Sequence, residues 1–209
     1  MQLLKWLSGA AVVALGVAVS AFATPALAAA GDECVKVLGY EWSGEKQSMD
    51  PADMESGDDA YHIFAVYNRL VDVDDNYNVI PELATEWSAS PDNLTWTFKL
   101  RHGVKFHSGK DFTAKDVVYT FKRMLDPALG SGAKAVLEFL DPDGIKAVDD
   151  YTVTFTTKKP VVQLPVLISN KFGNIVPDGS KLEDLRLHED GTGPFMQDQF
   201  TPNAPVRIL

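Results

Sequence analysis

The stretch from Pro81 to Leu125 constrains the fold of this chain more than any other part of the sequence. At its centre, residues 94–100 (LTWTFKL) alternate apolar and polar side chains without a break. This alternation is the period of a β-strand that buries one face. The pattern stops at residues 101–103, resumes briefly over residues 104–106, and then meets SGKD at residues 108–111, which predicts a turn.

A capped helix is predicted directly after this turn. Thr113 and Asp116 have the spacing of a capping box. The helix should end at Asp126-Pro127, because proline cannot continue a helix. Between these ends, apolar side chains recur at helical spacing and form one face, which consists of Val117, Val118, Phe121, Met124 and Leu125. A strand, a turn and a capped helix would by themselves describe an ordinary α/β core.

The amino-acid sequence of this stretch also contains segments that are typical of a protein family. Its three pieces are PELATEW at 81–87, LTWTFKLRHGVKFHSG at 94–109 and FTAKDVVYTFKRMLDP at 112–127, with MDP at 49–51, VYNRL at 66–70 and GTGPF at 191–195 on either side. Together they resemble the signature of the bacterial extracellular solute-binding proteins of family 5. Members of that family are the dipeptide-, oligopeptide- and nickel-binding subunits of ABC importers. The resemblance covers nearly everything after the first 30 residues.

The charge balance excludes one class of partner. The 209 residues contain 19 basic and 29 acidic side chains, which gives a net charge of -10. Nucleic-acid binding needs Lys and Arg clusters against phosphates, so no nucleic-acid partner is expected. Cys34 is the only cysteine. No disulfide can therefore form within these residues, and a single cysteine is a poor basis for metal or redox chemistry.

Residues 1–30 have the features of a secretory signal peptide. Lys5 gives a basic start, residues 7–22 are almost wholly apolar, and residues 26–30 contain small-residue cleavage sites. A transmembrane anchor is the rival interpretation, but the apolar run is shorter than the ~20 residues that a span needs. We therefore expect export to a periplasm. Two acidic residues precede Cys34 where a lipoprotein needs a small-residue box, so a lipid anchor is not expected.

Periodicity and turn residues predict further elements around the central stretch. We expect a strand over 35–40, a helix that starts at Ser56 and buries Ile63, Val66, Tyr67 and Leu70, a polar turn at 71–76, a short helix over 135–140, strands over 145–148 and 151–157, a charged loop over 178–190, and a strand at 206–209. The DVDDN run in the polar turn lacks the glycine and distal glutamate of an EF-hand, so a solvated turn is favoured over a calcium loop.

No catalytic set is recognisable in the sequence. The Gly-x-Ser-x-Gly elbow of hydrolases is absent. The four histidines are scattered, and structural or exposed roles are favoured for them: His62, His102, His107 and His188. Gly191-x-Gly193 lacks the third glycine of a dinucleotide loop and is interpreted as a tight turn. We expect no enzymatic activity, no cofactor and no metal.

The resemblance implies the fold. It is α+β (α/β-type), the class II clamshell of periplasmic binding proteins, with a mixed sheet and flanking helices. Family members are much longer and have a second lobe, so this chain is expected to be an N-terminal fragment that holds most of the first lobe. Residues 31–65 and 170–209 would belong to the ligand-facing part of that lobe. Residues 66–169 would form an inserted peripheral subdomain that contains the signature.

The resemblance also implies a ligand site between the lobes. The residues expected to face it are Tyr40, Trp42, Asp58, Asp59, Tyr61, Asn170, Lys171, Phe172 and Asn174. Aromatic side chains there could flank an apolar group, Asp59 could meet an ammonium, and Lys171 could meet a carboxylate. The implied function is capture of di- or oligopeptides by a periplasmic, monomeric subunit that delivers them to an ABC permease. The alternatives are a non-peptide solute, such as a nickel chelate, an opine or a glycoside, and an exported enzyme or adhesion module.

Overall fold

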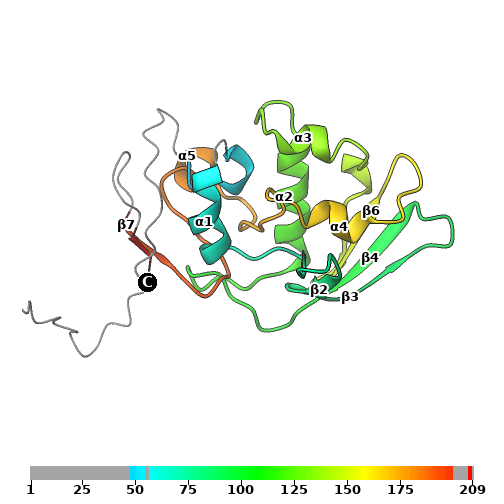
Figure 1. Cartoon of the computed structure of the whole chain (residues 1–209), viewed down its shortest axis with the longest axis horizontal. Coiled ribbons are helices and arrows are strands. Elements are labelled where there is room, and N and C mark those ends of the chain that lie inside the picture. The colour runs from blue at the N-terminus through cyan, green and yellow to red at the C-terminus, as the bar shows by residue number, and fades with distance from the viewer. Residues whose placement is uncertain (1–47, 55–56, 200–206, 209) are drawn as a thin grey trace, which may run out of the picture. The chain divides into compact units, whose positions relative to one another are not determined.

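The computed structural model describes residues 48–54, 57–199 and 207–208. These residues all belong to one compact unit, residues 33–209, whose course is traced in Figure 1. The predicted signal peptide, the predicted strand at 35–40 and Cys34 lie outside the described residues. Among the helices of the described residues, none has the length and apolar character needed to cross a membrane.

Helices and strands come in short runs along the described chain. The helical elements are η1 (Pro51–Asp53), α1 (Gly57–Val66), α2 (Ala114–Leu125), α3 (Ala133–Val136), η2 (Pro142–Gly144), α4 (Leu164–Ile168) and α5 (Leu182–Leu185), where η denotes a 3-10 helix. The strands are β1 (Val71–Val73), β2 (Val79–Pro81), β3 (Ala84–Ala89), β4 (Thr95–Leu100), β5 (Lys146–Asp149), β6 (Thr152–Thr156), β7 (Gln197–Gln199) and β8 (Arg207–Ile208).

The main sheet has four antiparallel strands in the order β3-β4-β6-β5. Strand β4 confirms the alternation of residues 94–100, because Trp96, Phe98 and Leu100 are buried while the residues between them are more exposed. The indole of Trp96 donates a hydrogen bond to the carbonyl of Val161 at 2.9 Å, which satisfies its one polar atom. The predicted strands at 145–148 and 151–157 are β5 and β6, which makes β5 an edge strand.

Helix α2 covers the buried face of this sheet and contacts β5 and β6. Its capping box forms as predicted, since the Asp116 carboxylate accepts the Thr113 N–H at 2.7 Å. The helix ends at Leu125, directly before Asp126-Pro127. Asp116 is fully buried, and it also accepts the N–H of Asp178 at 2.7 Å and pairs with Lys110. One capping residue therefore also fixes the loop that passes over the start of the helix.

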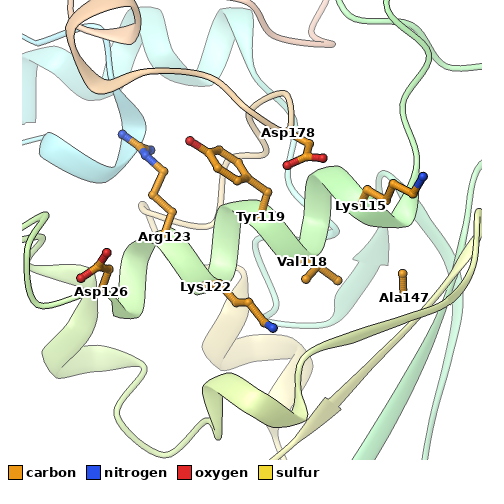
Figure 2. A pocket seen from close by; sticks show the side chains of 8 residues that line it. All are labelled: Lys115, Val118, Tyr119, Lys122, Arg123, Asp126, Ala147 and Asp178. Carbon is orange, nitrogen blue, oxygen red and sulfur yellow. The ribbon is translucent and has the colours of Figure 1, made fainter.

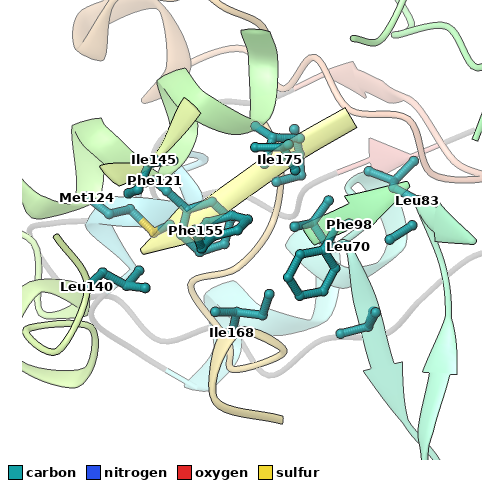
Figure 3. Close-up of a cluster of buried hydrophobic side chains, with 14 of the residues drawn as sticks. Leu70, Leu83, Phe98, Phe121, Met124, Leu140, Ile145, Phe155, Ile168 and Ile175 are labelled. Carbon is teal, nitrogen blue, oxygen red and sulfur yellow. The ribbon is translucent and has the colours of Figure 1, made fainter. Parts of the chain in front are cut away.

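An aromatic cluster joins α2 to the sheet (Figure 3). The Phe155 ring meets Phe98 edge-to-face at 5.5 Å between centroids and Phe121 at 4.9 Å. All three side chains are fully buried. Each such pair contributes about 0.5–1.5 kcal/mol beyond the burial of its area. The predicted strand and the predicted helix are thus held together at the centre of the larger core.

Two short pairs of strands lie outside the main sheet. Strands β1 and β2 are antiparallel, as are β7 and β8. The sequence predicted a polar turn over all of residues 71–76, and this is wrong for Val71–Val73, which form β1. The turn itself is confirmed at Asp74, whose carboxylate accepts the N–H groups of Asn76 and Asn78 at 2.8 Å each.

Four further sequence predictions need correction. The helix expected from Ser56 ends at Val66, so Tyr67 and Leu70 are buried as predicted but lie beyond the helix. The short strand expected at 104–106 is only an isolated bridge between Lys105 and Asp111. The helix expected over 135–140 is α3, which starts earlier and ends at Val136, because Leu140 instead pairs with Thr157. The loop predicted over 178–190 contains the short helix α5. By contrast, the strand predicted at 206–209 is confirmed as β8.

Candidate ligand-binding site

The structure describes some of the predicted ligand-facing residues and not others. Tyr40 and Trp42 lie outside the described residues. Asp58 and Asp59 lie in the first turn of α1, where only the backbone is described. The other predicted residues fall into two groups. Tyr61 and Lys171 are exposed, whereas Phe172 and Asn174 are buried and Asn170 is half-buried.

Helix α1 has an apolar face and an exposed aromatic face. Ile63 and Val66 are fully buried in a second hydrophobic cluster, which also contains Met54, Val176 and Leu185. On the exposed face, Tyr61 and Phe64 are 66% and 43% accessible. Their spacing of three residues places them on the same side of the helix. The sequence predictions missed Phe64, although its helical spacing from Tyr61 was a usable signal.

Arg69 connects this helix to the segment that follows α4. Its guanidinium lies 5.2 Å from the centre of the Phe64 ring. It donates a hydrogen bond to the carbonyl of Ser169 at 2.9 Å and pairs with Asp72 at 2.7 Å. Glu82, whose pKa is raised by burial, lies 3.8 Å from the same guanidinium. Arg69 is therefore a fixed cation beside an exposed aromatic ring.

Asn68 joins three further segments at the end of α1. Its amide donates to the Glu82 carboxylate at 2.6 Å, and its side-chain oxygen accepts the Thr192 hydroxyl at 2.9 Å. Its carbonyl accepts the N–H of Ile175 at 2.9 Å. Two predicted ligand-facing segments, α1 and residues 170–174, are thereby anchored to the same short piece of chain.

The segment 170–174 is a tightly hydrogen-bonded loop. The Asn170 side chain accepts the Phe172 N–H at 2.9 Å, and the Asn174 amide donates to the Lys171 carbonyl at 2.8 Å. Gly173 is required here, because a Cβ atom would lie 2.2 Å from the Ile168 carbonyl oxygen. The Lys171 ammonium rests 4.8 Å from the centre of the Phe172 ring. The Asn174 side-chain oxygen is buried without a hydrogen-bond partner in the structure.

Residues 191–195 pack directly on the carboxyl end of α1. The N–H of Gly193 donates to the Val66 carbonyl at 2.7 Å, and the His107 N–H donates to the Gly191 carbonyl at 2.9 Å. A Cβ atom on Gly191 would lie 2.0 Å from the Val66 oxygen. The tight turn predicted for this motif is confirmed as a bend at residues 192–194. The glycines are needed for close backbone contact.

A buried pair of titratable side chains lies between α1 and the chain that leads to this motif. His62 Nε2 is 4.0 Å from Glu189 Oε1, and these side chains are 14% and 0% exposed. Burial lowers the pKa of His62 to about 4 and raises the pKa of Glu189 to about 8. Neither carboxylate oxygen has a hydrogen-bond partner in the structure. The favoured state at neutral pH is an uncharged imidazole beside a protonated carboxyl group.

A separate groove of about 540 Å³ runs along α2 (Figure 2). It is lined by Lys115, Val118, Tyr119, Lys122, Arg123, Asp126, Ala147 and Asp178. The Arg123 guanidinium is held by the fully buried Asp50, at 2.9 Å for one of the two contacts, and the Tyr119 hydroxyl donates to the Ser180 carbonyl. Two of its polar groups are thus committed to the fold. None of the predicted ligand-facing residues lines this groove.

The arrangement is suited to binding a small solute that has both polar and apolar groups. It offers exposed aromatic rings for apolar groups and the exposed cation Lys171 for a carboxylate, whereas Arg69 is already paired with Asp72 and Glu82. Among the residues that the structure describes, no group of three or more His, Cys, Asp or Glu side chains has the geometry of a metal site.

Comparison with known proteins places this arrangement in a family. Residues 78–208 match the profile of the family described as "Bacterial extracellular solute-binding proteins, family 5 Middle". Di/tripeptide-binding protein 2 of Pseudomonas aeruginosa (strain UCBPP-PA14) is 31% identical, in an alignment that covers 82% of this chain and 37% of that protein.

Two solved structures extend the likeness to the fold. AgaA from Agrobacterium tumefaciens R10, in complex with agropinic acid, has a TM-score of 0.72 and 27% identity, and the match covers 79% of this chain and 34% of that one. The periplasmic binding protein DppA of Helicobacter pylori, in complex with the peptide STSA, has a TM-score of 0.67 and 30% identity, over 78% and 36%. The chain thus spans roughly a third of the length of these relatives. It belongs to family 5 of the bacterial extracellular solute-binding proteins and has the fold of a periplasmic binding protein.

Proposed function

We propose that this chain is part of a substrate-binding subunit that captures di- or oligopeptides and delivers them to the permease of an ABC importer. The observation that carries the proposal is the family match over residues 78–208. The peptide class is supported by the name of the P. aeruginosa relative and by the peptide bound to the H. pylori protein. On this proposal the chain acts in the periplasm as a monomer and catalyses no reaction.

The proposed mechanism is closure of two lobes around the solute. A ligand that contacts both lobes favours the closed state by its difference in affinity for the two states. The permease would then distinguish the closed form from the open one. Residues 31–65 and 170–209 would supply the ligand-facing surface of the first lobe. Residues 66–169 would form the peripheral subdomain.

The proposed ligand-facing residues divide by exposure. The exposed Tyr61 and Lys171 would contact the peptide directly, as would Phe64, which we add to the site. The buried Phe172 supports the Lys171 ammonium from below, and Asn174 closes the loop that carries it. Tyr40, Trp42, Asp58, Asp59 and Asn170 keep the roles that the family resemblance implies, in which Asp59 would meet the peptide ammonium.

Calorimetric titration of the full-length protein tests the proposal. The ligands are a dipeptide, a tripeptide, agropinic acid, a nickel chelate and a glycoside. Saturable binding of the peptides without a released product is expected. Binding of none of these ligands, or conversion of the peptide to a product, would overturn it. Tyr61→Ala and Lys171→Ala should each weaken peptide binding roughly tenfold, because each contact is worth ~1–2 kcal/mol. Tyr77→Ala and Lys115→Ala, at exposed positions outside the site, are the matched controls.

An opine is the second candidate ligand class. The observation in its favour is the agropinic acid bound to AgaA, whose fold this chain shares at a TM-score of 0.72. The same titration separates the two classes. Tighter binding of agropinic acid than of either peptide would select the opine.

A further inference from the structure

A groove of about 420 Å³ lies between helices α3 and α4 (both labelled in Figure 1) and the chain that connects β6 to α4. It is lined by Ala135, Val136, Glu138, Phe139, Lys158, Lys159, Val161 and Leu167. None of these residues belongs to the proposed ligand-facing set. The groove therefore needs a separate explanation.

Exposed apolar side chains concentrate at this groove. Val136 and Leu167 line it and are 45% and 36% exposed. Val162 and Val166, which adjoin lining residues in the sequence, are 70% and 36% exposed. Scattered exposed apolar side chains are normal in soluble proteins, but a contiguous patch marks an interaction surface.

The fold does not require these outward apolar side chains. Helix α3 and its following turn are anchored through Ala133 and Leu137, which are fully buried in the larger core. Helix α4 is anchored in the same core through Leu164 and Ile168. Each short element thus already has a buried side. Within the described residues, the apolar side chains on its other side are left exposed.

Basic side chains outnumber the one acidic side chain that lines the groove, Glu138, although the whole chain is acidic. Lys134, Lys158 and Lys159 are exposed at or beside the groove, in a chain of net charge -10. The Lys158 ammonium donates to the backbone carbonyl of Glu138 at 2.8 Å, which holds it at the rim. In the part of the chain that the structure describes, none of the three lysines forms an ion pair with a carboxylate. Their charges are free to meet an acidic partner.

We propose that this groove docks a segment of a partner protein that carries apolar side chains flanked by Asp or Glu. The apolar side chains would enter between Val136 and Leu167, and the carboxylates would meet the lysines at the rim. The concave shape favours inserted side chains over a flat lipid surface. Three lysines are also fewer than the roughly four to eight that recognition of anionic lipid headgroups uses.

The test uses the full-length protein and a fluorescein-labelled synthetic peptide with Leu and Phe on one helical face and Glu and Asp around them. Saturable binding by fluorescence anisotropy is expected, with an affinity that falls as salt is raised. Two control peptides replace Leu and Phe with Ser, or Glu and Asp with Lys, and both should bind at least roughly tenfold more weakly.

Variants locate the binding. Leu167→Ser and the double variant Lys158→Glu with Lys159→Glu should each reduce the affinity roughly tenfold. The matched controls Val148→Ser and Lys146→Glu, on the exposed edge strand β5, should leave it unchanged. Urea unfolding of each variant verifies that the fold is intact.

Four outcomes would overturn the proposal. They are an absence of binding, equal binding by the control variants and the groove variants, tighter binding to phosphatidylglycerol vesicles than to the acidic peptide, and a dimer in sedimentation that Leu167→Ser dissociates. The third would assign the groove to a membrane surface, and the fourth to a second copy of this chain.

Discussion

Raising the pH from 6.5 to 8 should destabilise this protein through one buried carboxyl group. Glu189 has a fully buried side chain 4.0 Å from the ring of His62. Burial raises the pKa of Glu189 from 4.5 to about 8 and lowers the pKa of His62 from 6.5 to about 4. The folded protein therefore keeps a proton on Glu189 that the unfolded chain has lost.

The two groups act in opposite directions and in different pH ranges. Between pH 4.5 and 6.5 the unfolded chain holds its proton on His62 and the folded protein holds one on Glu189, so the contributions cancel. Above pH 6.5 the histidine is neutral in both states. From there to about pH 8 the unfolded chain binds one proton fewer, and the free energy of unfolding falls by ~1.4 kcal/mol per pH unit. The total loss is about 1.3 kcal/mol, because His62 in the unfolded chain at pH 6.5 and Glu189 in the folded protein at pH 8 are each half-titrated.

Urea unfolding at pH 6.5 and at pH 8 measures this loss. Glu189→Gln mimics the protonated carboxyl group and should be less sensitive to this change of pH than the wild type, by at least about 1.3 kcal/mol. Glu183→Gln, on the exposed side of α5, is the matched control and should behave as the wild type. Equal pH sensitivity in Glu189→Gln and the wild type would refute the reasoning. It would mean that His62 and Glu189 form a charged ion pair at neutral pH instead of a neutral pair.

Three further substitutions test the contacts that hold the fold. Asp116→Ala leaves two part-buried backbone N–H groups without their acceptor and should lower the free energy of unfolding by ~1–3 kcal/mol in urea. Gly191→Ala places a Cβ atom 2.0 Å from a backbone oxygen of α1 and should cost at least ~3 kcal/mol, whereas Gly132→Ala meets only a ring edge at 3.3 Å and should cost less than ~1 kcal/mol. Arg69→Lys cannot reproduce the fork of contacts to Asp72 and Ser169, so hydrogen exchange should quicken at residues 170–176 while the rest of the sheet is unchanged.

The sequence was sufficient to predict the centre of the fold, because the strand and the helix there are each determined by patterns in neighbouring residues. Strand β4 follows from strict alternation, and α2 follows from a capping box, an apolar stripe and a terminal proline. The incorrect secondary-structure predictions have causes that lie in residues distant in the sequence. Val71–Val73 form a strand because they pair with β2, and the helix predicted to reach residue 140 stops early because Leu140 pairs with Thr157. Partners distant in the sequence leave no local pattern.

The candidate site shows the same division. Tyr61 remains a prediction from its place in a helix that the family pattern makes ligand-facing, and the exposure of Phe64 beside it could have been expected from helical spacing. The burial of Phe172 and Asn174 could not, because it depends on a loop that folds back onto α4. In the sequence, Arg69 and Asn68 could be recognised only as members of a family motif, without any indication of their contacts. Their function as junctions between α1, the β2–β3 connection and residues 169–176 needs three-dimensional contacts.

The short motifs that carry the family resemblance lie where segments distant in the sequence contact one another. Their side chains and glycines make close contacts there that other residues would not reproduce. MDP supplies Asp50, a fully buried carboxylate that caps η1 and holds Arg123 of α2. VYNRL supplies Asn68 and Arg69, and GTGPF supplies the glycine that touches the carboxyl end of α1. Their contacts fix the relative positions of α1 and the 170–174 loop, from which the ligand-facing surface that we propose is built.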